Sequence, residues 1–356
     1  MRPVDLQLEP NEASDLCPVL NGEALRGLGW DMAFATVLDE SPAERALAVL
    51  GHEAAQPLHG GWRATRIKAK PDRAKRKTED AEACSRRDGW LVLLGSQFGS
   101  KDGPLDPRRS WIARVREEAV AEALIDGGKP RLELRRLRFG LHRAVNDALA
   151  DSGVQTLELG TRSRAAFIDE TIALGAAKAK RWAGAVRSAD QPINIEAAEF
   201  RGDGRLLLGL RYPVTADGNP ILVELNDVDA VFADGGAPRC SPPWVLEGVG
   251  DPAAPRGIRA LHSRGNDEFD AIVGNLESSG TGVAVLEDHP EAERAASSHV
   301  RFSLPLAASG GTLKVEPVRQ LGGETKRIEG IVTAGGHTFY VLDQDGRVAL
   351  RALQVT

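Results

Sequence analysis

The stretch Asn194–Gly209 decides the fold, and it reads NIEAAEFRGDGRLLLG. Mostly apolar or small residues precede Asp203-Gly204, and the apolar run Leu206–Leu208 follows it. An Asp-Gly pair between two such runs is typical of a tight turn that joins antiparallel strands. The stretch therefore predicts a β-hairpin whose first strand carries Glu196 near its beginning.

The same pattern recurs along the chain. Residues 80–95 read DAEACSRRDGWLVLLG, residues 327–343 read RIEGIVTAGGHTFYVLD, and residues 257–274 give a weaker copy, GIRALHSRGNDEFDAIVG. Runs 32–38 and 45–50 predict a further hairpin, and 110–115 and 220–225 predict third strands. Repeated units of short antiparallel strands predict an all-β fold, namely a β-propeller of five or six blades.

The gap between the copies at 80–95 and 194–209 is too long for one blade. Leu141, Val145 and Leu149 fall at helical spacing, and Gly153 marks the end of that pattern. We therefore expect residues 1–356 to form a single propeller domain, with residues 117–190 as a partly helical insertion between blades.

Composition narrows the class of protein. The 356 residues carry a net charge of −6, which disfavours a general attraction to nucleic acid or to membrane surfaces. The first ten residues lack the apolar run of a signal peptide, and no run of about 18 apolar residues follows. Cys17, Cys84 and Cys240 are odd in number and widely spaced, as expected of reduced thiols. These features predict a cytoplasmic protein.

Familiar catalytic signatures are missing from the sequence, because it contains no G-x-S-x-G, H-E-x-x-H or phosphate-binding loop motif. A basic tract occupies residues 63–77, with one acidic residue, Asp72, within it. The tract carries no aromatic side chain between Arg63 and Lys77 for stacking on bases, so we interpret it as a solvated loop between the first two blades.

At these repeats the sequence resembles the bacterial family known as domain of unknown function 3616. The segments that carry the resemblance are Asn194–Ala198 with Leu206–Val214, Gly257–Arg259, and Asp80–Glu82 with Gly95-Ser96, although Gln97 stands where the family pattern has His. More loosely, the architecture resembles phytase-like, calcium-binding propellers. The resemblance implies the fold and assigns no reaction.

In a propeller the inner strands line the central channel, so Glu82, Glu196 and Glu329 are expected at equivalent positions near one mouth. Converging carboxylates repel one another unless a cation or an arginine compensates them. A divalent cation such as calcium is one answer, since it takes six to eight oxygen ligands. Arg211 and Arg259 offer the other, as ion-pair partners for the same carboxylates or as contacts for an anionic ligand.

These residues support three functions. The favoured one is a ligand-binding or interaction propeller whose mouth holds a cation or a small polar ligand. The first alternative is a metal-dependent hydrolase of phosphoesters or esters, with the glutamates as metal ligands or general base. The second alternative is a scaffold that binds protein partners through its blade loops.

Overall fold

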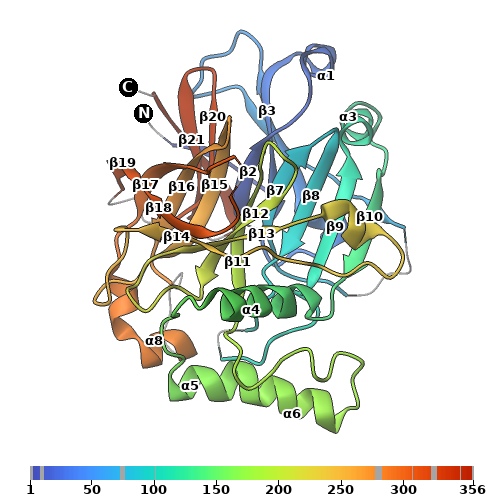
Figure 1. The fold of residues 1–356 in the computed structure, drawn as a ribbon. Helices are drawn as coiled ribbons and strands as arrows, with labels where there is room; N and C mark the ends of the chain where they lie inside the picture. Colours follow the sequence, from blue (N-terminus) through green and yellow to red (C-terminus); the bar gives the residue numbers. More distant parts are fainter. Residues whose placement is uncertain are drawn as a thin grey trace.

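The structure is a computed structural model that describes residues 3–8, 12–72, 77–100, 102–276, 283–306, 308–321, 327–344 and 346–354. It is mostly β, and the described strands form five sheets (Figure 1). Sheet 1 contains β2 (Ala13–Pro18), β3 (Trp30–Leu38), β4 (Leu47–Glu53) and β5 (Trp62–Arg66). Sheet 2 contains β7 (Ala81–Arg87), β8 (Trp90–Gly95), β9 (Trp111–Arg116), β10 (Arg131–Arg136) and β6 (Lys70–Pro71).

The other three sheets follow the same order from the inner to the outer strand. Sheet 3 contains β11 (Asn194–Phe200), β12 (Leu206–Tyr212), β13 (Ile221–Leu225), β14 (Trp244–Glu247) and β18 (Gly311–Lys314). Sheet 4 contains β15 (Gly257–Gly265), β16 (Glu268–Gly274), β17 (Ser298–Ser303) and β19 (Glu316–Gln320). Sheet 5 contains β20 (Ile328–Ala334), β21 (His337–Gln344), β22 (Arg347–Gln354) and β1 (Val4–Leu6).

The inner strands of the five sheets form a ring. Strand β2 contacts β7, β7 contacts β11, β11 contacts β15, β15 contacts β20, and β20 contacts β2. Five apolar clusters fill the spaces between neighbouring sheets, and each draws its buried side chains from two of them. Radial packing of this kind is the arrangement of β-propellers.

The predicted turns between first and second strands are present. Asp88 and Gly89 both have positive φ angles, of 49° and 73°, as a type I′ turn requires. Gly209, the last residue of the 194–209 copy, lies within β12 and has a different role. A Cβ on Gly209 would lie 2.4 Å from Cγ2 of Ile258 on β15, so its absence lets sheets 3 and 4 pack closely.

The first sheet differs from the sequence prediction. The runs at 32–38 and 45–50 are its second and third strands, and residues 43–46 are the short helix α2 (Ala43–Ala46). Its inner strand, β2, was missed because ASDLCP lacks an alternating apolar pattern. The loop interpretation of the basic tract was wrong for β5 and β6, which are strands, and Arg73, Lys75 and Arg76 lie outside the described residues.

Helices gather at the two ends of the ring (Figure 1). At one end lie α1 (Gly22–Leu28) and α3 (Glu117–Asp126). At the other lie α4 (Gly140–Ser152), α5 (Thr161–Ser163), a π-helical turn (Arg164–Asp169), α6 (Glu170–Ala177) and α8 (Ala284–Asp288). Besides α2, the remaining helices in the described part of the chain are α7 (Val228–Phe232) and a 3₁₀ turn (Pro290–Arg294).

The helix predicted around Leu141–Ala150 is α4, and Gly153 caps it with a φ of 70°. The span 117–190 also contains β10, which pairs with β9 in sheet 2, so strand and helix alternate there. The division of the chain at 117 and 190 stays a prediction. Among the described residues, no helix has the length and apolar character needed to cross a membrane.

Sheet 5 combines strands from both ends of the described chain. Strand β1 pairs antiparallel with β22, with Val4 opposite Leu350 and Leu6 opposite Val348. Leu6 is buried in the apolar cluster between sheets 5 and 1. Strand β1 therefore helps to hold sheet 5 against sheet 1.

We predict that Leu6→Ala lowers the free energy of unfolding by about 2–5 kcal/mol, because it removes a buried leucine at this junction. Urea unfolding measures the change, and Gln7→Ala, at an exposed neighbouring position, is the control. Equal stability of the two variants would contradict a stabilising role for β1.

Candidate functional site

Every inner strand has a shift in register near its beginning. The shift lies between Ala81 and Ala83 in β7, and the corresponding shifts in β11, β15 and β20 include Glu196, Arg259 and Glu329. In β2 it lies between Ser14 and Cys17. A β-bulge turns the extra residue out of the regular alternation. The bulges thus bring charged side chains to equivalent places around the ring.

A cavity of about 350 Å³ opens at this place. Its acidic lining residues come from all the sheets except sheet 4: Glu12, Asp39, Glu40, Asp80, Glu82, Glu196, Glu329 and Asp343. Only two of the lining residues are basic, Arg109 and Arg211. Phe98 also lines the cavity and packs in the same apolar cluster as Phe167 of the π-helical turn. The cavity therefore lies at the end of the ring that the α4–α6 helices cover.

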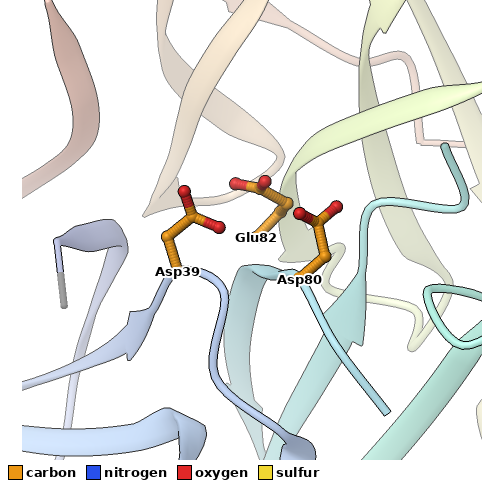
Figure 2. A group of neighbouring side chains, drawn as sticks. All are labelled: Asp39, Asp80 and Glu82. Atoms are coloured by element: carbon orange, nitrogen blue, oxygen red, sulfur yellow. The ribbon is translucent and has the colours of Figure 1, made fainter. Parts of the chain in front are cut away.

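Three of these carboxylates converge (Figure 2). Asp39 follows β3, Asp80 precedes β7, and Glu82 lies on the bulge of β7. One carboxylate oxygen from each lies within 4.8 Å of the others. At an effective dielectric constant of about 20, two unit charges at that distance repel by roughly 3 kcal/mol. Ionisation of all three is therefore costly without a cation between them.

The pKa values of this acidic triad follow from that repulsion and from burial. Burial, together with the negative charge of Asp80, raises the pKa of Asp39 to about 8. Burial and the charge of Asp39 raise the pKa of Glu82 well above its usual value. Burial also raises the pKa of Asp80, against the opposing effect of Arg109, whose Nη1 lies 2.9 Å from Oδ1 of Asp80. Without a cation, the carboxyl of Asp39 is therefore mostly protonated at neutral pH.

The other two predicted glutamates have arginine partners. Nη1 of Arg211 donates to Oε1 of Glu196 at 2.9 Å, which joins β12 to β11 within sheet 3. Nη2 of Arg259 donates to Glu329, which joins sheet 4 to sheet 5. Burial and the nearby charge of Arg211 lower the pKa of Arg259 to about 10. All three predicted glutamates thus line one cavity, while Glu329 also links two neighbouring sheets of the ring.

Asn194 adds an uncharged oxygen to the site. Its Nδ2 donates to Oε1 of Glu196 at 2.9 Å, which fixes the orientation of the amide. Asn194 lines the cavity and is only 8% exposed. Its Oδ1 is buried and has no hydrogen-bond partner among the described residues. A buried acceptor without a donor is costly, and a cation or a ligand N–H in the cavity would satisfy it.

Sequence reasoning missed Asp39 and the position of Asp80. Asp80 begins the 80–95 copy and aligns with Asn194, which is not acidic. The acidic residue that the copies share is the glutamate two positions later. Asp39 directly follows the predicted strand at 32–38 and lies at the end of a second strand, outside the compared inner strands. The signal for Asp39 in the sequence is its place directly after the apolar run 32–38.

Comparison with known proteins gives only a general likeness. No family model matches the chain, and no curated protein matches it. Among solved structures it is similar to the WD40 β-propeller domain of Doa1, with 8% identity, a TM-score of 0.34 and coverage of 97% of this chain and 95% of that chain. A Bacillus subtilis levansucrase gives 9% identity, a TM-score of 0.43 and coverage of 98% and 85%.

The β-propeller domain of Swd1 from Myceliophteria thermophila gives 9% identity, a TM-score of 0.35 and coverage of 100% of both chains. Scores this low concern the general fold and carry no argument about chemistry. The resemblance to domain of unknown function 3616 stays a prediction, because no family model matches.

We predict that Arg259→Met lowers the free energy of unfolding by about 3–5 kcal/mol, because it leaves the carboxylate of Glu329 without its buried partner. The double variant Arg259→Met/Glu329→Met should recover most of that loss. Urea unfolding of both single variants and the double variant gives the coupling energy, and additive losses would show that the pair does not brace sheets 4 and 5.

Proposed function

We propose that this protein is a cytoplasmic β-propeller of five blades that binds a divalent cation at its mouth and presents the cation to a small polar ligand. The acidic triad of Asp39, Asp80 and Glu82 carries the proposal. Family membership in domain of unknown function 3616 is part of it, since that resemblance implies the same architecture.

The imbalance of charge around the triad supports a cation. Arg211, Arg259 and Arg109 compensate Glu196, Glu329 and Asp80 respectively. Glu82 forms no hydrogen bond or ion pair among the described residues, and it lies beside Asp39. A divalent cation would replace the protons that the raised pKa values imply and remove the mutual repulsion.

The chemistry of the donors favours calcium. The triad supplies carboxylate oxygens, Asn194 supplies an amide oxygen from the same cavity, and the triad includes no histidine or cysteine. Hard oxygen donors suit calcium or magnesium better than zinc. Calcium takes six to eight ligands, so three carboxylates leave positions for water and for a bound ligand. Glu196 and Glu329 would then form the opposite wall of the ligand site.

A second candidate function is a cation-dependent hydrolase. The observation that favours it is that Arg211 lines the same cavity as the triad, because a cation and an arginine can together hold an anionic ester. A cation at the triad would polarise an ester or phosphoester, and Arg211 would contact the anionic group. An interaction scaffold without a small-molecule site is the outcome if no cation binds.

Calorimetric titration with calcium chloride tests the cation site. We expect saturable binding near pH 8, and at least a tenfold weaker affinity for Glu82→Gln and for Asp39→Asn, because each removes one charged ligand. Asp126→Asn, at the exposed end of α3, is the matched control and should bind calcium as the wild type does. Absence of calcium binding by the wild type would sink the proposal and favour the scaffold.

We also predict a pH dependence of stability in the cation-free protein. A carboxyl whose folded pKa is raised stabilises the fold below its unfolded pKa, and that stabilisation is lost as pH rises through the folded pKa. For Asp39 this window runs from about 4 to about 8. Thermal melts should therefore show a falling melting temperature across this range, with a smaller fall for Asp39→Asn and for calcium-loaded protein. An identical slope in Asp39→Asn would contradict the assigned burial of this carboxyl.

A further inference from the structure

A second cavity, of about 400 Å³, adjoins the acidic one. Ser100 and Arg109 line both cavities, so the two cavities are neighbours at these residues. The second cavity lies between the segment around residues 104–109 and the end of helix α6.

The second cavity has the opposite charge. Four basic side chains line it, Arg108, Arg109, Lys178 and Lys180, against one acidic side chain, Asp106. Arg108 is already compensated, because it forms ion pairs with Asp106 and Glu79. Lys178 and Lys180 are exposed and form no ion pair among the described residues. Their positive charge is therefore available to an anionic group.

Arg109 lies at the junction of the two cavities. Its Nη1 donates to the carbonyl oxygen of Gly99 at 2.9 Å and forms the ion pair with Asp80. Its Nε is buried and has no acceptor among the described residues. An anionic oxygen of a ligand would supply that acceptor through a charge-assisted hydrogen bond. The Nε of Arg109 therefore supports an anion site independently of the two lysines.

The walls of the second cavity are partly apolar. Leu174 and Trp182 line it, and both are partly buried. The ring of Trp182 contacts Phe139 edge to face, with the ring centroids 5.0 Å apart, and this contact holds the indole in place. Leu105, whose side chain is buried, completes this wall. Concave sites with apolar walls and a few convergent charges are typical of small-molecule sites.

We propose that the second cavity is the anion subsite for a small molecule with an apolar or aromatic body. Its phosphate or carboxylate group lies at the junction, where it is shared between the cation on the triad and the basic group of Arg109, Lys178 and Lys180. Its apolar body lies against Trp182. This inference rests on the proposed cation function and adds to it the chemical class of the ligand.

Phenyl phosphate is the probe, with benzoate to compare a carboxylate and phenol as the uncharged control. We expect saturable calorimetric binding of phenyl phosphate to the calcium-loaded protein and no binding of phenol. Lys178→Ala/Lys180→Ala should weaken phenyl phosphate binding at least tenfold while leaving the calcium affinity unchanged. Lys129→Ala, at an exposed lysine in the loop before β10, is the matched control and should bind phenyl phosphate normally.

Trp182→Ala separates the two halves of the ligand. It should weaken binding of phenyl phosphate at least tenfold while leaving that of inorganic phosphate unchanged, since only phenyl phosphate has an apolar body. Circular dichroism and the calcium affinity establish that each variant is folded. Calcium binding without phenyl phosphate or benzoate binding would overturn the anion subsite, and so would undiminished binding by the lysine variant.

A titration in the absence of calcium distinguishes the two proposals. If calcium does not bind but phenyl phosphate binding still depends on the lysines, the proposed cation function fails and the anion subsite stands. If neither calcium nor phenyl phosphate binds, both fail.

Discussion

The bulge carried by each inner strand is the constraint on which the site depends. Five strands meet around one axis, and in four of them the bulge presents a charged residue, Glu82, Glu196, Arg259 or Glu329. Like charges in such a small space are tolerable only when other groups compensate them. The compensation is uneven, because Glu196 and Glu329 form ion pairs with arginines, whereas Glu82 lies beside two further carboxylates.

Because of this uneven compensation, the arginine-paired glutamates have a structural role in the ring, whereas the acidic triad is the candidate for a chemical role. The buried ion pair of Arg259 with Glu329 joins sheet 4 to sheet 5, and that of Arg211 with Glu196 joins two strands of sheet 3. Such pairs are costly to break. The acidic triad, in contrast, keeps carboxylates whose pKa values are raised, a state that costs stability and that functional sites commonly retain. The bulge of β2 holds Asp15, which is buried and accepts from the backbone N–H groups of Leu16 and Cys84. Burial raises the pKa of this carboxyl too, but its hydrogen bonds are to the backbone.

Much of the fold and about half of the site could be predicted from sequence. The hairpins were visible because Asp88-Gly89 and Gly335-Gly336 sit between apolar runs, and the repeats placed three glutamates on one cavity. The inner strand β2 was not visible, since Asp15 interrupts its pattern with a positive φ angle of 59°. Asp39 was not visible as a ligand because its nearness to Glu82 arises from contact between sheets 1 and 2, which no local pattern encodes.

Closure of the ring has a consequence for folding during synthesis. Because β1 pairs with β22, β1 must wait until Arg347–Gln354 is made before sheet 5 is complete. During that interval the edge of the unfinished sheet and the apolar face around Leu6 stay unpaired. Contacts between such distant parts of a chain slow folding and leave strand edges open to misassembly. Until β22 is made, this edge is therefore a place at which the nascent chain can misassemble.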